Sequence, residues 1–137
     1  MSTKQAAAIA YAQAGITDPF KDLDFGVLHD CFTITELISI QDLGLCKPGE
    51  AADLVRGGVT AVDGEFPINP DGGLKCFGHP IGATGCRMIG EVTRQVLGKT
   101  NGLQVKNAKA GFAHNLRGPL SVACVTVVGI PDWEPGN

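Results

Sequence analysis

The sequence Asn-Pro-Asp-Gly-Gly-Leu-Lys-Cys-Phe-Gly-His-Pro-Ile-Gly-Ala-Thr-Gly occupies residues 69–85. Its first six residues favour a turn, and a glycine-rich loop follows at residues 78–85. A glycine-rich loop before a helix can bind an anion through backbone N–H groups, or its glycines can simply permit close packing. The loop matches neither the phosphate-loop pattern nor the dinucleotide-binding fingerprint. By itself, it indicates a functional or tightly packed loop without naming a ligand.

A long amphipathic helix is predicted directly after this loop, because apolar residues recur at helical spacing on one side: Met88, Ile89, Val92, Val96 and Leu97. Upstream, alanines at helical spacing predict a helix over residues 3–14, capped by Thr3 and stopped by Gly15. Residues 24–29 resemble a short buried strand.

Two further helices are expected between that strand and the glycine-rich loop. Thr33 and Glu36 have capping-box spacing and would open a helix over residues 34–43 that Gly44 closes. A shorter helix is expected over residues 50–55, and the glycine pair at 57–58 would end it.

Two strands are expected near the C-terminus, over residues 108–114 and 120–130, with a turn at 115–119. The second is apolar on both faces, which favours a central strand. The order of elements predicts an α/β fold with a mixed sheet flanked by helices. Three strands make a small sheet, so we expect another strand to come from elsewhere. The organisation predicted is one domain over residues 1–130 and a tail over 131–137.

Composition excludes several classes of function. The 137 residues are 44% hydrophobic and 18% charged, with a net charge of −3 and no basic run. A packed core is therefore expected, and a nucleic-acid partner is not. No apolar run has the roughly 18 residues of a membrane helix. Neither a signal peptide nor a Ser-Lys-Leu-type peroxisomal address is evident, so we expect no membrane association and a cytoplasmic location.

The histidines and cysteines are the candidates for chemistry. His29 and His114 end predicted strands, and His79 lies in the glycine-rich loop, which are places where ligands collect in α/β proteins. Cys31 and Cys76 lie close to histidines in sequence. This pattern suits a thiol–imidazole acid–base site or, with poorer spacing, a zinc site.

The odd cysteine count, without close Cys-x-x-Cys spacing, predicts reduced thiols. We expect Cys46, Cys86, Cys124 and Cys76 to be structural residues, the first three of them buried.

The residues 69–85 resemble the thiolase signature, in which an Asn and paired glycines precede Gly-His-Pro-x-Gly-x-x-Gly. The segment His29-Asp-Cys-Phe stands where most thiolases have Asn-Glu-Ala-Phe, and it is typical of the sterol-carrier-protein-type branch. The resemblance extends from the first helix to about Gly129. It implies the C-terminal half of a thiolase, an acyltransferase that forms or cleaves carbon–carbon bonds in acyl-CoA thioesters.

The resemblance also implies roles for individual residues. His79 would activate a nucleophilic cysteine, His29 would help bind a thioester oxygen, and Cys31 would be the second acid–base thiol. The implied residues of the substrate- and coenzyme-A-binding region are Gly78, Gly82, Thr84, His114 and Asn115. Coenzyme A thioesters would be substrates, and neither a resident cofactor nor a metal is expected. A Claisen step requires a base near neutral pKa and fixed donors for the oxyanion, which imidazole and thiol groups suit.

Two departures from the family pattern affect this interpretation. The nucleophilic cysteine of thiolases belongs to their N-terminal half, so we expect this chain to need that half, or an oligomeric partner, to complete the site. A thiolase C-terminal domain normally begins one strand earlier, and without that strand a sheet edge would be open. The chain would then be either an excised fragment or a subunit.

Arg117 is the second departure, because it stands where the family has a glycine whose N–H helps form an oxyanion hole. It could abolish that hole, or it could serve a carboxylate substrate or a partner surface. A catalytically inactive structural or regulatory relative of thiolases is therefore the alternative interpretation.

Overall fold

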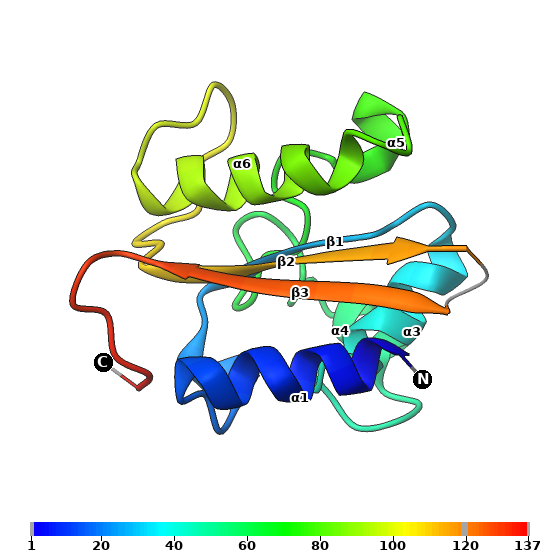
Figure 1. The fold of residues 1–137 in the computed structure, drawn as a ribbon, viewed down its shortest axis with the longest axis horizontal. Coiled ribbons are helices and arrows are strands. Elements are labelled where there is room, and N and C mark those ends of the chain that lie inside the picture. Colours follow the sequence, from blue (N-terminus) through cyan, green and yellow to red (C-terminus); the bar gives the residue numbers. More distant parts are fainter. Residues whose placement is uncertain (1, 119–120, 137) are drawn as a thin grey trace.

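A computed structural model describes residues 2–118 and 121–136 as three layers, with a small sheet between two layers of helices (Figure 1). Helices α5 and α6 cover one face of the sheet, and α1, α3 and α4 cover the other. The elements are, in order, α1 (Ser2–Ala14), α2 (Pro19–Asp22), β1 (Phe25–Leu28), α3 (Thr33–Asp42), α4 (Ala51–Arg56), α5 (Gly73–Phe77), α6 (Thr84–Val96), β2 (Ala110–Arg117) and β3 (Val122–Gly129). The predicted α/β class with a mixed sheet flanked by helices is confirmed.

The sheet has the strand order β1-β2-β3. β1 pairs with β2 in parallel, from Phe25 opposite Gly111 to Leu28 opposite His114, and β2 pairs with β3 antiparallel. The prediction that the last strand is central was therefore wrong, because β2 is central and β3 lies at the edge. Helix α1 contacts β3 from one side and α6 contacts it from the other, and together they cover its apolar faces in part, with no residue of β3 fully buried.

Two glycines allow β1 and β2 to pair closely. A Cβ atom added to Gly26 would lie 2.2 Å from the ring of Phe112, its partner in the register, and one added to Gly111 would lie 2.5 Å from the ring of Phe25. Each phenylalanine thus covers the glycine opposite it. Phe25 packs in the cluster beneath α6, and Phe112 packs in the cluster on the α1 side. The pair of strands is thereby anchored in both halves of the core.

Glycines end the helices as predicted. Gly15, Gly44 and Gly58 all have positive φ angles. In each case the next residue donates a backbone hydrogen bond to a carbonyl five positions earlier: Ile16 to Tyr11, Leu45 to Ile40 and Val59 to Leu54. These bonds define the Schellman motif, which satisfies carbonyls that the helix leaves unpaired.

The predicted N-terminal caps were wrong. Thr3 lies inside α1, and its hydroxyl contacts Nε2 of the buried His114 at 3.2 Å. α3 begins at Thr33 with Phe32 as its N-cap, and no side chain caps it. The side chain of Glu36 instead accepts a hydrogen bond from Lys75, 39 residues later. These two side chains therefore bind residues that are distant in the sequence and do not cap the backbone N–H groups at the start of a helix.

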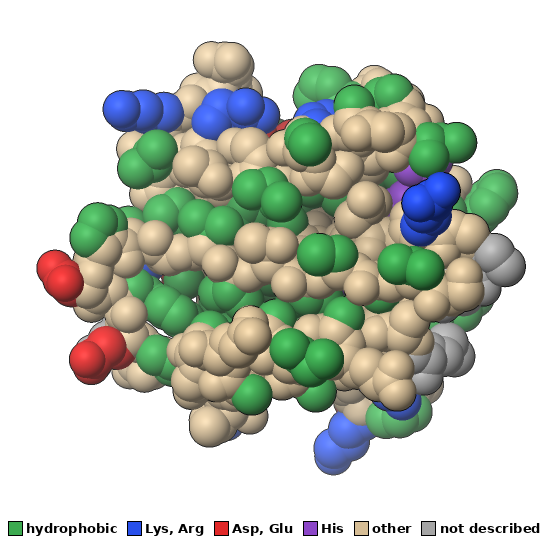
Figure 2. Space-filling model, viewed as in Figure 1, with side chains coloured by type: hydrophobic (Ala, Val, Ile, Leu, Met, Phe, Trp, Pro, Cys, Tyr) green, Lys and Arg blue, Asp and Glu red, His purple; other side chains and the backbone are tan. Residues whose placement is uncertain are grey.

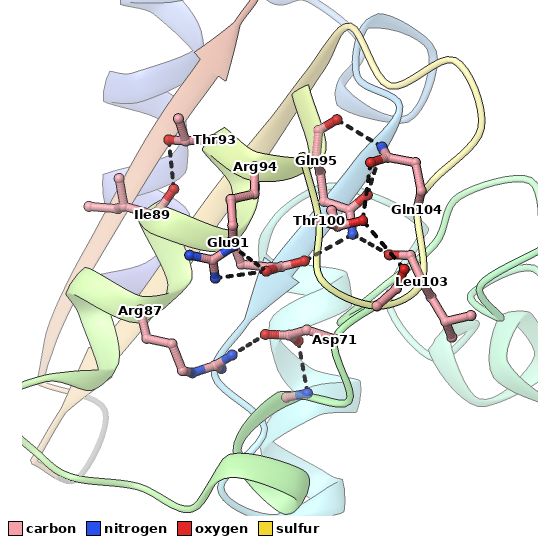
Figure 3. Close-up of polar contacts among 12 residues, drawn as sticks. Asp71, Arg87, Ile89, Glu91, Thr93, Arg94, Gln95, Thr100, Leu103 and Gln104 are labelled. Carbon is pink, nitrogen blue, oxygen red and sulfur yellow. Dashed lines mark hydrogen bonds and ion pairs between the residues drawn. The ribbon is translucent and has the colours of Figure 1, made fainter. Parts of the chain in front are cut away.

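A buried glutamine fixes the loop that follows α6 (Figure 3). The side-chain nitrogen of Gln95 donates to Glu91 Oε1 at 2.9 Å and to the Leu103 carbonyl at 2.8 Å. Its oxygen accepts from Val105 N at 2.8 Å and from Gln104 Nε2 at 3.1 Å. Both donors and the acceptor are satisfied, as a buried carboxamide requires.

A second polar contact in the same region joins α6 to the turn before the glycine-rich loop. Arg87 on α6 bonds to Asp71, and Asp71 also accepts the backbone N–H of Gly73 at 3.0 Å (Figure 3). The turn at the start of residues 69–85 is thus joined to α6, the helix that begins at the end of this stretch.

Other boundaries differ from the sequence-based expectations. Residues 115–117, expected in a turn, continue β2, and residues 73–77 form the short helix α5. The expected tail has no regular structure over residues 131–136, but Trp133 packs against the core. None of the helices in the described residues is both long and apolar enough to span a bilayer.

We predict that Gly26→Ala lowers the free energy of unfolding by about 2–3 kcal/mol, the usual cost of overpacking a close contact. The reason is the collision with the ring of Phe112. The matched control is Gly102→Ala, where an added Cβ meets nothing within 4 Å and a change below about 0.5 kcal/mol is expected. Urea unfolding measures both variants. Equal effects for the two would contradict the close pairing of β1 and β2.

We predict that His114 makes the protein less stable in acid. Burial, with the nearby charge of His29, lowers the pKa of His114 from 6.5 to about 4. Between these values the unfolded chain binds the proton and the folded chain does not, so stability falls as pH drops from 6.5 toward 4. His114→Gln should remove a loss of about 2 kcal/mol at pH 5. Above pH 7.5 the difference between parent and variant should be constant, and parallel stability profiles down to pH 4 would refute the assignment.

Candidate functional site

A cavity of about 720 Å³ opens at the carboxyl ends of β1 and β2. Three segments line it: residues 29–32 after β1, residues within 74–82 around α5 and the glycine-rich loop, and residues 115–118 at the end of β2. Carboxyl ends of parallel strands are where α/β folds collect ligands. Histidine surface is visible at the right-hand end of Figure 2, beside basic and hydrophobic side chains.

His29 follows β1 directly and is almost fully buried at 3% exposure. Its Nδ1 lies 2.8 Å from Oδ1 of Asn115, and the Leu116 N–H approaches the same nitrogen at 3.5 Å. Because the amide oxygen can only accept and makes the shorter contact, Nδ1 donates to it and Nε2 is left as an acceptor. Burial lowers the pKa of His29, and the charge of His79 adds to this, while the bond to Asn115 and the charge of Asp30 oppose it. His29 is therefore a neutral imidazole at neutral pH.

His79 is held in one tautomer by the fully buried Thr84. The hydroxyl of Thr84 donates its single proton to the Pro80 carbonyl at 3.1 Å, since a carbonyl can only accept. The Thr84 oxygen, 2.8 Å from Nδ1 of His79, must then accept the proton on Nδ1. The neutral ring consequently carries its lone pair on Nε2, as a general base requires. His79 is itself exposed, so a group from outside the chain can reach it.

The three predicted catalytic residues line the same cavity. The rings of His29 and His79 lie edge to face, with centroids 4.8 Å apart. The half-buried thiol of Cys31 lies 3.7 Å from the Thr35 hydroxyl, to which it donates. Two imidazoles and one thiol therefore face one space, where they can act as acids and bases on a bound small molecule.

The predicted binding residues divide into two groups. Gly82 and Asn115 line the cavity. Gly78 ends α5 outside the lining, with a positive φ of 74° that suits glycine. Thr84 and His114 are buried at 1% and 0% exposure, so they lie behind the cavity wall. Thr84 supports His79, and His114 supports the contact of β2 with α1.

Asp30 is a site residue that the sequence interpretation did not single out. Its carboxylate is almost fully buried and accepts the backbone N–H of Leu74 at 2.8 Å. A side chain on Gly73 would collide with it, at 2.4 Å from Oδ2. Asp30 thereby joins the segment after β1 to α5, which carries the glycine-rich loop. The sequence did offer one signal for Asp30, which is its position between His29 and Cys31. An acidic residue that is buried at such a position is expected to have a partner.

The cysteines are all free thiols, as predicted. The expectation that Cys86 and Cys124 are buried was wrong, because both are exposed, as is Cys76. Cys124 lies on the edge strand β3, and Cys86 lies on the outer side of α6. Across residues 2–118 and 121–136, no group of three or more His, Cys, Asp or Glu side chains is arranged to hold a metal ion.

Comparisons with known proteins identify the family of this chain. The family described as "Thiolase C-terminal domain-like" matches residues 1–130. The acetyl-CoA acetyltransferase of Methanothermobacter thermautotrophicus is 39% identical over 126 residues, covering 92% of this chain and 32% of the relative. Human sterol carrier protein 2 is 40% identical over 131 residues, covering 95% of this chain and 24% of the relative.

A solved structure gives the same fold. The Ltp2-ChsH2(DUF35) aldolase superposes with a TM-score of 0.77 at 22% identity, covering 95% of this chain and 32% of that one. The chain thus spans about a quarter to a third of the length of these similar proteins. With the family match over residues 1–130, the conclusion is that this chain belongs to the thiolase C-terminal domain-like family.

Proposed function

We propose that this chain supplies the acid–base half of a thiolase-type site that transfers acyl groups between coenzyme A thioesters. The observation that carries the proposal is the convergence of His29, Cys31 and His79 on one cavity, with Thr84 holding the His79 tautomer. The nucleophilic cysteine would come from a thiolase N-terminal half, because similar proteins are about three to four times as long as the matched region.

The first step begins at His79. Nε2 removes the proton from the partner's cysteine thiol, and the resulting thiolate attacks the thioester carbonyl. As the new carbon–sulfur bond forms and the bond to the coenzyme A sulfur breaks, the proton on His79 passes to the departing thiolate. The exposure of His79 supports this step, because a cysteine from another segment has access to Nε2.

The second step uses the other two residues. Cys31, once its thiol proton has been released, removes the proton alpha to a second thioester, and the enolate carbon attacks the acyl group. A carbon–carbon bond forms as the bond from the acyl carbon to the partner's cysteine breaks, and the departing thiolate takes up the proton held by Cys31, which restores both groups. His29 Nε2 accepts a proton from a water whose other proton is donated to the thioester oxygen, which stabilises the developing enolate. The bond from Nδ1 to Asn115 supports this role, because it leaves Nε2 as the acceptor.

The altered end of β2 favours a second candidate function, that of a non-catalytic partner of thiolases. β2 runs straight through Arg117, which pairs with Val122, and its side chain lines the cavity. The family's glycine would leave that space open. The two candidate functions differ in enolate formation, because an acyltransferase removes the alpha proton of a thioester and a non-catalytic partner does not.

We predict that the 137-residue chain alone exchanges the alpha protons of acetyl-coenzyme A in deuterated buffer, because proton removal needs only groups that this chain contains. Cys31→Ala should lower the exchange rate by about 100-fold or more, the usual contribution of a general base. Cys86→Ala removes an exposed thiol outside the cavity and should leave the rate unchanged. Mass spectrometry of the recovered thioester measures the rate. A parent at the buffer rate, with Cys31→Ala indistinguishable from it, would favour the non-catalytic partner.

We predict that Thr84→Val changes the tautomer of His79. Valine keeps the shape but can neither accept from Nδ1 nor donate to the Pro80 carbonyl, so the Nδ1–H form loses its support. Nitrogen-15 NMR of the imidazole should show mainly Nδ1–H in the parent and in Thr84→Ser, and a mixture in Thr84→Val. Outer partners that orient an imidazole are worth about 10- to 100-fold in activity, so we expect at least a tenfold loss of acyl transfer once the N-terminal half is supplied. Identical spectra for Ser and Val variants would show that Thr84 does not set the tautomer.

A further inference from the structure

The cavity has an apolar wall and a basic wall. Phe32 and Ile81 line it with side chains that are 69% and 75% exposed, which is unusual for residues of this size. Arg117 and Lys75 line it as well, and their charges face the same space as the three catalytic candidates. An occupant that suits both walls has an apolar chain and an anionic group.

Lys75 is not available for that anion. Its Nζ lies 3.0 Å from Oε2 of Glu36 and 3.9 Å from Oδ2 of Asp30. Two carboxylates therefore compensate this single ammonium charge, and Asp30 is buried and fixed by the Leu74 N–H. Lys75 adds no net positive charge to the cavity.

Arg117 is the cation that remains. It ends β2, paired with Val122 of β3, so the sheet fixes where its side chain starts. Its guanidinium is exposed and makes no ion pair or hydrogen bond with any residue in the described part of the chain. By contrast, Arg56, Arg87 and Arg94 all pair with a carboxylate. A guanidinium presents a planar set of donors that matches a carboxylate.

We infer that Arg117 binds a carboxylate at the far end of the acyl group, so that the cavity selects thioesters of dicarboxylic acids. The inference rests on the proposed function, since it names the substrate class of the same site. Apolar carbons of the acyl chain pack on Phe32 and Ile81 while the terminal carboxylate meets the guanidinium. A phosphate of coenzyme A offers similar chemistry, so the test must separate these two anions.

Pantetheine thioesters distinguish a contact with the acyl carboxylate from a contact with phosphate, because they lack the nucleotide phosphates of coenzyme A. The binding of succinyl-pantetheine and butyryl-pantetheine, which have equal numbers of acyl carbons, would be measured by calorimetry on the 137-residue chain at low salt. We expect the parent to bind the succinyl thioester about five- to tenfold more tightly, which corresponds to the net contribution of one ordinary hydrogen bond, because solvent access weakens the charged pair. Added salt should reduce this preference by screening.

Three variants assign the preference to Arg117. Arg117→Gln should abolish it, Arg117→Lys should retain part of it, and Arg117→Glu should reverse it. The matched control is Arg56→Gln, which removes one exposed arginine charge outside the cavity and should keep the full preference.

Four outcomes are informative. The pattern above supports the inference. An Arg117→Gln variant that weakens both thioesters equally overturns it, because the residue would then act without regard to the carboxylate. Loss of binding to coenzyme A itself, with the succinyl preference intact, also overturns it and assigns Arg117 to phosphate. If the parent binds neither thioester even when a thiolase N-terminal half is supplied, the proposed function fails, and the inference fails with it.

Discussion

Because β1 and β2 pair in parallel, their carboxyl ends open at the same edge of the sheet, and every other part of the site depends on that edge. The register puts Leu28 opposite His114, so the next residues, His29 and Asn115, meet and form a hydrogen bond. Close pairing is possible because the two strands exchange phenylalanine rings over glycines. These rings enter separate halves of the core, and the core therefore holds the register of the functional edge.

Hydrogen bonds between polar groups connect that edge of the sheet to the loop that contains His79 and fix where the loop lies. Asp30 bonds the start of α5, Asp71 bonds Arg87 on α6, and Thr84 in the first turn of α6 bonds His79. Burying such groups costs free energy unless each is satisfied, and Arg87 has two buried nitrogens, Nε and Nη2, without a hydrogen-bond partner among the described residues. The same low-dielectric surroundings keep His29 and His114 neutral, since burial lowers the pKa of both. The site is thus an edge with two imidazoles and a thiol, in which the charge of Lys75 is compensated by carboxylates and the guanidinium of Arg117 has no partner among the described residues.

Local signals predicted the features that local physics controls. Glycines at positions 15, 44 and 58 end helices because a left-handed backbone suits only glycine at low cost, whatever the surroundings. The N-terminal caps failed because threonine and glutamate side chains bond to whatever donor or acceptor lies nearest, and for Thr3 and Glu36 that partner is far away in sequence. The position of β3 was misjudged for a similar reason. Apolar residues on both faces suggested two neighbouring strands, but β3 has one, and helices α1 and α6 cover its faces only in part.

The α/β class, the C-terminal ends of three helices and the identity of the chemical groups could be predicted from the amino-acid sequence, because the signals for each are continuous in the chain. How those groups act together depends on the folded structure. It brought His29 and His79 into ring contact, 50 residues apart, and placed Thr84 and His114 behind the wall instead of in it. It also left Arg117 without a partner among the described residues while compensating Lys75. The physical reason is that burial, tautomer and ion pairing depend on distances across the fold, and sequence spacing carries no such distances.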